Sequence, residues 1–139
     1  MPRLPPAILA GDAMRVQEIL EGLLLLHSSH HDLSRPELFY HAFVLGLLVE
    51  LEETHHVRSN REVAYGRSDI QIFPKKPGDP GVVIEFTAGP EAQGEALAEA
   101  ALLQITERRY TAELEAAGVS PIRKLGISFS GKKVVVRGA

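Results

Sequence analysis

The sequence predicts an α/β domain in which two helices precede three strands, and a long helix separates these from two further strands. Three observations support this order. Apolar residues recur at helical spacing in the first third of the chain, short strand-like runs follow between residues 57 and 87, and a second helical stretch begins at Pro90. The chain, residues 1–139, fits one compact domain, with no internal repeat and no credible boundary.

The composition is typical of a globular protein with a core of its own. The apolar fraction is 45%, the net charge is −3, and there is no cysteine. The lack of cysteine excludes disulfides, thiolate catalysis and cysteine-based zinc sites, and it fits a cytoplasmic setting. No signal peptide is visible, and the longest apolar stretch is too short for a bilayer, which takes about 20 residues, so no membrane partner is expected.

Two helices are predicted in the first third of the chain. Residues 1–11 contain three prolines and are predicted to be a loose lead-in. Asp12 can cap a helix that should end near His27. Ser34 and Glu37 form an S-x-x-E capping box around Pro36, and the helix that follows is apolar nearly all round. We expect this second helix to be the buried central helix.

The pattern then changes to strands. Val57–Val63 and the alternating run Asp69–Phe73 predict the first two, and Val82–Thr87 predicts a third, central strand. Several prolines and glycines place a turn between the second and third strands at residues 74–81.

The last third of the chain is predicted to hold one helix and two strands. Pro90 opens the longest helix, which should run to about Ala117 and stop at Gly118. Leu125–Phe129 and Lys133–Val136 are the predicted fourth and fifth strands.

Two carboxylates on the predicted hairpin could carry chemistry. Side chains alternate along a strand, so Glu85 shares a face with Thr87, and Asp69 shares one with Gln71. If the two strands pair across the turn, the carboxylates of Asp69 and Glu85 converge. Two carboxylates that share a site repel each other, which favours a divalent ion, and Mg²⁺ prefers such oxygen ligands.

A structural explanation competes with this one, and from spacing alone it comes first. Glu85 could be half-exposed on a sheet face and paired with a nearby arginine. Asp69 could be a turn or strand-start residue, which is common after a glycine-containing turn.

Longer stretches of the sequence resemble a known family. Gly66-Arg67-Ser68-Asp69-Ile70 followed by Val83-Ile84-Glu85-Phe86-Thr87 resembles the PD-(D/E)xK nuclease superfamily, in particular the branch found at the C-terminus of AAA-ATPase-like proteins. The resemblance extends over most of the chain. Its other pieces are His30-His31-Asp32 with Glu37-Leu38-Phe39-Tyr40-His41, Gln104-Ile105 with Arg109-Tyr110, and Lys124 to Lys132.

The resemblance implies a restriction-endonuclease-like mixed sheet and a metal-dependent DNA phosphodiesterase that uses Mg²⁺ or Mn²⁺. Asp69 and Glu85 would match the acidic ligands, and the carbonyl of Phe86 would complete the set. Glu37 would match an acid of the first core helix, and Gln104 a polar helix residue near the site. DNA is the implied partner, while a homodimer and an association with an ATPase are left open.

The sequence departs from the family at the lysine position, where it has Thr87. In the family this lysine orients the attacking water and stabilises negative charge, so its loss could cost about 10²–10³ in rate. Three explanations compete: the domain only binds nucleic acid or serves assembly, a basic group such as Arg108 has taken the role, or Thr87 is an introduced change.

Two of the implied site residues have structural explanations as well. The capping box accounts for Glu37 in full. Gln104 is expected to point inward, where a buried amide needs either a carboxylate of the site or backbone as partner.

The charge distribution leaves the nucleic-acid contact open. All charged residues after Ser120 are basic, and with Arg58, Arg61 or Arg67 they could hold a phosphate backbone, although solvated strand ends explain them equally well. They are Arg123, Lys124, Lys132, Lys133 and Arg137. An interaction domain with no nucleic-acid role is the third hypothesis, and the net negative charge fits it.

Overall fold

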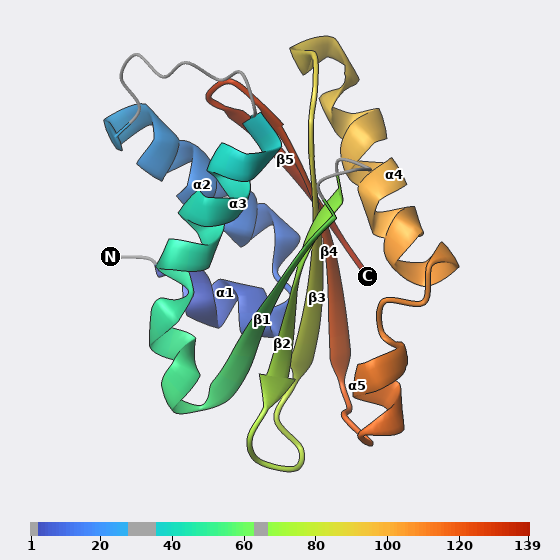
Figure 1. Ribbon diagram of the computed structural model, residues 1–139. Helices are drawn as coiled ribbons and strands as arrows, with labels where there is room; N and C mark the ends of the chain where they lie inside the picture. Colours follow the sequence, from blue (N-terminus) through green and yellow to red (C-terminus); the bar gives the residue numbers. More distant parts are fainter. Residues whose placement is uncertain (1–2, 28–35, 63–66) are drawn as a thin grey trace.

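The computed structural model describes residues 3–27, 36–62 and 67–139. It contains a five-stranded sheet with helices on both faces (Figure 1). The strand order is β1-β2-β3-β4-β5; β3 and β4 pair parallel, and the other neighbours pair antiparallel. The predicted fold class, a restriction-endonuclease-like mixed sheet in an α/β chain, is confirmed.

The elements follow one another along the chain as predicted, with additions near the ends of helices. They are α1 (Leu4–Ala10), α2 (Ala13–His27), α3 (Pro36–Leu47), the 3₁₀ turn η1 (Val49–Glu53), β1 (His55–Glu62), β2 (Arg67–Pro74), β3 (Gly81–Ala88), the 3₁₀ turn η3 (Glu91–Gln93), α4 (Gly94–Glu107), α5 (Ala112–Ala116), β4 (Ile122–Ser130) and β5 (Lys133–Gly138). In the described part of the chain, no helix is both long and apolar enough to cross a membrane.

The two faces of the sheet are covered by different helices and form two separate cores. The α3 face, which includes Ile70, Ile84 and Phe86, packs against α1, α2 and α3 and forms the main core. The α4 face is covered by α4 and α5, and a smaller core gathers there around Val83 and Ile105 (Figure 1). Because side chains alternate along β3, Glu85 lies on the α4 face together with Val83.

A glycine lets α4 lie directly on the sheet. A Cβ atom at Gly126 of β4 would lie 2.3 Å from the carbonyl oxygen of Ala98 and 2.5 Å from the amide nitrogen of Leu102. Such separations are far below ordinary van der Waals contact, so only glycine permits this approach. The position of α4 over the sheet therefore depends on Gly126.

On the other face of the sheet, α2 contacts the edge strand β5. The backbone N–H groups of Val134 and Val136 donate to the side chains of Glu21 and Gln17 on α2, at 3.2 and 3.0 Å. Side chains four residues apart on a helix lie on the same face, which lets them match alternate residues of a strand. These contacts satisfy two edge donors that would otherwise be available for pairing with another chain.

The loose lead-in predicted for residues 1–11 is wrong, because Leu4–Ala10 form α1. Proline is tolerated in the first turn of a helix, where its missing N–H has no partner to lose. Leu4 and Ile8 are buried in the main core, and Gly11 ends the helix with φ of 69°. Pro5 and Pro6 therefore stand where a helix accepts them.

The single long helix predicted to run to about Ala117 is also wrong, because α4 ends at Glu107. Arg109 has φ of 56°, and the N–H groups of Arg109 and Tyr110 donate to the carbonyls of Thr106 and Ile105. This is the Schellman pattern, which usually carries glycine at the left-handed position. An arginine there gives no sequence signal. Gly118 ends α5 with φ of 76°, so the predicted stop itself is confirmed.

Tyr40 of α3 contacts β4 and the turn that follows it. Its ring stacks on Phe129 with centroids 4.1 Å apart, and its hydroxyl donates to the carbonyl of Gly131 at 2.8 Å. Burial raises the pKa of Tyr40 above its usual value, because the phenolate would lose its hydration.

We expect Tyr40 to make the protein sensitive to alkali. Its contribution to stability is fully present below the pKa of an unfolded tyrosine, about 10, and is lost as pH rises through the higher folded pKa. At neutral pH, Tyr40→Phe should lower the free energy of unfolding by about 1 kcal/mol, because the hydrogen bond is lost. Above pH of about 10, the free energy of unfolding of this variant should decline less than that of the parent. Urea unfolding at neutral and alkaline pH measures both effects. Parallel declines in the two proteins would contradict this role for Tyr40.

Candidate metal centre

Asp69 and Glu85 lie directly opposite each other on neighbouring strands. The predicted pairing of β2 with β3 is confirmed, and Asp69 is the register partner of Glu85. Directly opposed residues of an antiparallel pair project to the same face with Cβ atoms about 4.5–5.5 Å apart. The exposed fractions of Asp69 and Glu85 are only 7% and 3%. The structure thus brings the two carboxylates together on the α4 face.

The donor set fits a hard divalent cation. Two buried carboxylates at one place repel each other and lose hydration, and a cation relieves both costs. Among the described residues, no group of three or more histidine, cysteine or acidic side chains is arranged to hold a metal. Two carboxylates can serve a divalent cation that keeps several waters and takes few protein ligands.

Asp69 also has a polar neighbour on the edge strand. Asn60 of β1 is the register partner of Asp69, and its amide nitrogen donates to Asp69 Oδ2 at 3.4 Å. The same nitrogen donates to Oε1 of Gln71 at 3.4 Å, and Gln71 Nε2 donates to the carbonyl of Tyr110 at 2.9 Å. The sequence did not point to Asn60. Its place beside Asp69 depends on the register between β1 and β2, and no local sequence pattern predicts that register.

Comparison with known proteins assigns the chain to a family. The family profile described as the PD-(D/E)XK nuclease superfamily matches residues 35–138, from α3 to β5. The chain belongs to the PD-(D/E)XK nuclease superfamily. No curated protein matches the chain.

The superfamily's motif has Asp, then Asp or Glu, and then lysine two residues later; in this chain Asp69 and Glu85 occur in that order, and Thr87 stands two residues after Glu85. Thr87 shares the α4 face with Glu85, is half-buried, and pairs in register with Ser128 on β4. Ser128 is 1% exposed, and its hydroxyl has no hydrogen-bond partner among the described residues. The position expected for the superfamily's lysine therefore carries a hydroxyl group, pairs in register with Ser128, and brings no positive charge of its own.

Gln104 lies on the flank of α4 that faces β3. On the same flank, a Cβ at Gly89, just after β3, would meet the side chain of Leu97 at 2.6 Å. The opposite flank faces β5, where Arg137 pairs with Glu95 and Glu99. Gln104 is half-buried on this flank.

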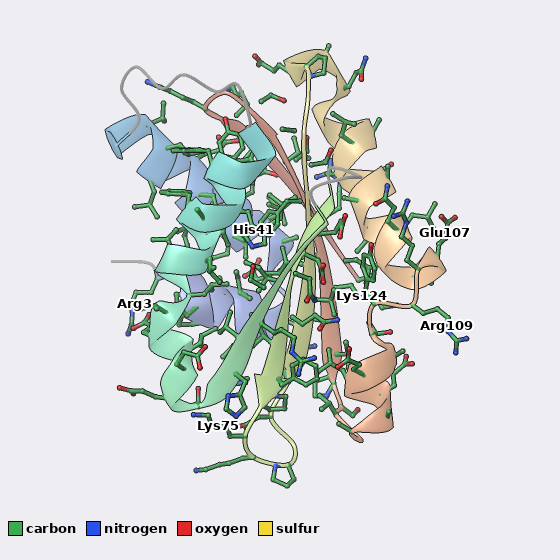
Figure 2. All side chains as sticks on the ribbon, viewed as in Figure 1. Arg3, His41, Lys75, Glu107, Arg109 and Lys124 are labelled. Atoms are coloured by element: carbon green, nitrogen blue, oxygen red, sulfur yellow. The ribbon has the colours of Figure 1, made fainter. Side chains whose placement is uncertain are left out.

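Arg108, the substitute considered for the lysine, stands at the C-cap of α4, one turn beyond Gln104, with an exposed side chain. Its neighbour Arg109 points away from the body of the molecule (Figure 2).

The residues of α3 lie on the other side of the sheet. His41 is buried between α3 and the sheet, where Nε2 contacts the Ser59 hydroxyl and the ring meets the edge of Phe86 (Figure 2). The side chain of Phe86 thus belongs to the α3 face, while its carbonyl lies within the strand between Glu85 and Thr87. Glu37 stands in the first turn of α3, but its side chain lies outside the described residues.

Several of the expected basic residues have partners within the chain. Arg58 forms an ion pair with Glu113 and stacks over Phe73, and Arg123 donates to the carbonyl of Leu9. Lys124 reaches the hydroxyl of Thr106. Lys132 and Lys133 are exposed at the turn between β4 and β5, and the side chains of Arg61 and Arg67 lie outside the described residues.

Proposed function

We propose that this chain is a Mg²⁺- or Mn²⁺-dependent phosphodiesterase domain that acts on DNA. The observation that carries the proposal is the opposed, buried pair of Asp69 and Glu85 in a chain of the nuclease superfamily. When bound, the ion would polarise the scissile phosphate and lower the pKa of a water molecule. Asp69 and Glu85 would hold the ion, with the carbonyl of Phe86 as a further ligand.

The remaining site residues would act on the substrate rather than the ion. Gln104 would orient the phosphate or the water from the α4 flank. Thr87 supplies a hydroxyl but no positive charge, so stabilisation of the developing charge would be weak. Exposed basic side chains such as Arg108 would contact the DNA backbone, and such contacts weaken steeply as salt rises.

Thr87 also supports a second candidate function. A domain of the nuclease fold without the lysine could bind nucleic acid without cleaving it. It could also serve assembly with an ATPase, as the resemblance to the branch found in AAA-ATPase-like proteins suggests. Both candidates place an ion on Asp69 and Glu85, so they differ in turnover and not in metal binding.

The two carboxylates can be tested through stability as well as activity. Asp69→Asn and Glu85→Gln keep the shape of each side chain but remove one of two like charges. With Mn²⁺ at 100 times its Kd, the parent should gain about 2.7 kcal/mol, while neither variant should gain.

Thermal unfolding with and without Mn²⁺ measures this difference, and plasmid nicking measures cleavage. Glu107→Gln is the matched control, because it removes the same charge from an exposed position at the end of α4 (Figure 2). The control should behave as the parent does. A stabilisation by Mn²⁺ that survives in both carboxylate variants, or is absent from the parent, rejects the proposed site.

A further inference from the structure

The side-chain amides of Asn60 and Gln71 form a hydrogen-bonded chain from Asp69 to the backbone carbonyl of Tyr110. The Tyr110 carbonyl determines which group of each amide is the donor. A backbone carbonyl can only accept, so the carbonyl of Tyr110 requires Gln71 to present its NH₂ group there, at 2.9 Å. Gln71 is 5% exposed, and its other end, Oε1, consequently faces Asn60 as an acceptor. Asn60 must then present its own NH₂ group, and the same nitrogen meets Asp69 Oδ2.

The backbone turn that supplies this carbonyl is itself held in an unusual shape. Arg109 adopts the left-handed conformation, with φ of 56°, and Tyr110 N–H bonds back to the carbonyl of Ile105 at 3.0 Å. These contacts aim the Tyr110 carbonyl at the sheet and not along the axis of α4. Tyr110 also packs in the smaller core with Val83, which anchors the turn.

From this chain of contacts we infer that Asn60 is a positioning residue for the metal site. Its NH₂ group, oriented through Gln71 by the Tyr110 carbonyl, holds the Asp69 carboxylate in one rotamer opposite Glu85. A carboxylate that is already held loses less conformational freedom when an ion binds. This inference rests on the proposed function, because it assigns Asn60 a role toward the ion that Asp69 and Glu85 would share.

The position of Asn60 makes the inference easy to test. Asn60 is exposed on the edge strand, so its truncation should leave the fold intact. Removal of a residue that orients a metal ligand typically lowers the affinity for the metal by about 10–100-fold. We expect Asn60→Ala to weaken Mn²⁺ binding to the full chain by about 10-fold.

A second variant tests the direction of the chain of amides. Gln71→Met keeps the length of the side chain but removes both its donor and its acceptor. Asn60 then loses the contact that orients it, so Mn²⁺ affinity should fall, by less than in Asn60→Ala. In the Asn60→Ala background, Gln71→Met should have no further effect on affinity, because Gln71 acts through Asn60.

The experiment is a calorimetric titration with Mn²⁺ of the parent, the three variants and the control Arg58→Lys. Arg58 lies two residues from Asn60 on the same face of β1, and lysine keeps its charge. NMR of the side-chain NH₂ groups gives a second readout: the Asn60 signal should shift when Mg²⁺ is added and should move in Gln71→Met.

Each result decides between the hypotheses. Weaker binding in Asn60→Ala and unchanged binding in Arg58→Lys support the inference. Parental affinity in Asn60→Ala, or an Asn60 signal that ignores both Mg²⁺ and Gln71→Met, overturns the role of Asn60 and leaves the proposed site standing. Parent protein that binds no Mn²⁺ overturns the proposed site and the inference together.

Discussion

Replacing Thr87 by lysine is expected to raise the rate of Mg²⁺-dependent DNA cleavage by about 10²–10³-fold. The substitution places a cation two residues after Glu85 on the same face of β3, beside the ion that Asp69 and Glu85 would hold. The surroundings can accept it, because Thr87 is half-buried and the Ser128 hydroxyl next to it is a buried acceptor.

Plasmid nicking with Mg²⁺ or Mn²⁺ measures the rate, and two further variants isolate the cause. Thr87→Met adds a side chain of similar reach without charge and should gain nothing. Thr87→Lys combined with Asp69→Asn should be inactive, because the charge is useful only beside a bound ion. Cleavage that appears only with lysine identifies the parent as a binding domain of nuclease fold.

The opposite result is equally informative. If the parent cleaves and Thr87→Lys does not change its rate, the missing charge is already supplied from elsewhere, and the predicted gain is wrong. Arg108 on the β3-facing flank of α4 is the group to test next, since Arg108→Gln should then abolish cleavage.

The largest effect on stability is expected at Gly126. Gly126→Ala would place a methyl group 2.3 Å from one backbone atom of α4 and 2.5 Å from another. No rotamer change can relieve contacts with backbone, so α4 must move away from β4. We expect a loss of about 3 kcal/mol or more, which corresponds to a fall in Tm of about 10 °C.

A matched control comes from α2. Gly22 is exposed within that helix, and a Cβ there would meet nothing within 4 Å. Gly22→Ala should therefore stabilise the protein by about 0.5–1 kcal/mol through helix propensity, the opposite sign from Gly126→Ala. Thermal unfolding of both variants gives the comparison. Similar Tm values for Gly126→Ala and the parent would show that α4 does not depend on this glycine.

The sequence by itself determined the order of the five strands and of the longer helices among them, and it indicated that Asp69 and Glu85 could share a face. Alternation along the two runs places Asp69 with Gln71 and Glu85 with Thr87, and the turn between the runs favours the pairing that the structure confirms. These are properties of neighbouring residues, so a local pattern suffices to predict them. The departure at Thr87 is visible only against the superfamily's motif, which the sequence resembles.

Only the tertiary structure decided what surrounds the two carboxylates. Asn60 reaches Asp69 through the register of an edge strand, and Gln71 meets the carbonyl of Tyr110, 39 residues further along the chain. That carbonyl is aimed by Arg109, whose left-handed conformation carries no residue signal, and α4 is seated by a contact between Gly126 and backbone atoms. Contacts of this kind join residues that are distant in sequence. Their geometry comes from how whole elements pack, and periodicity along the chain does not encode it.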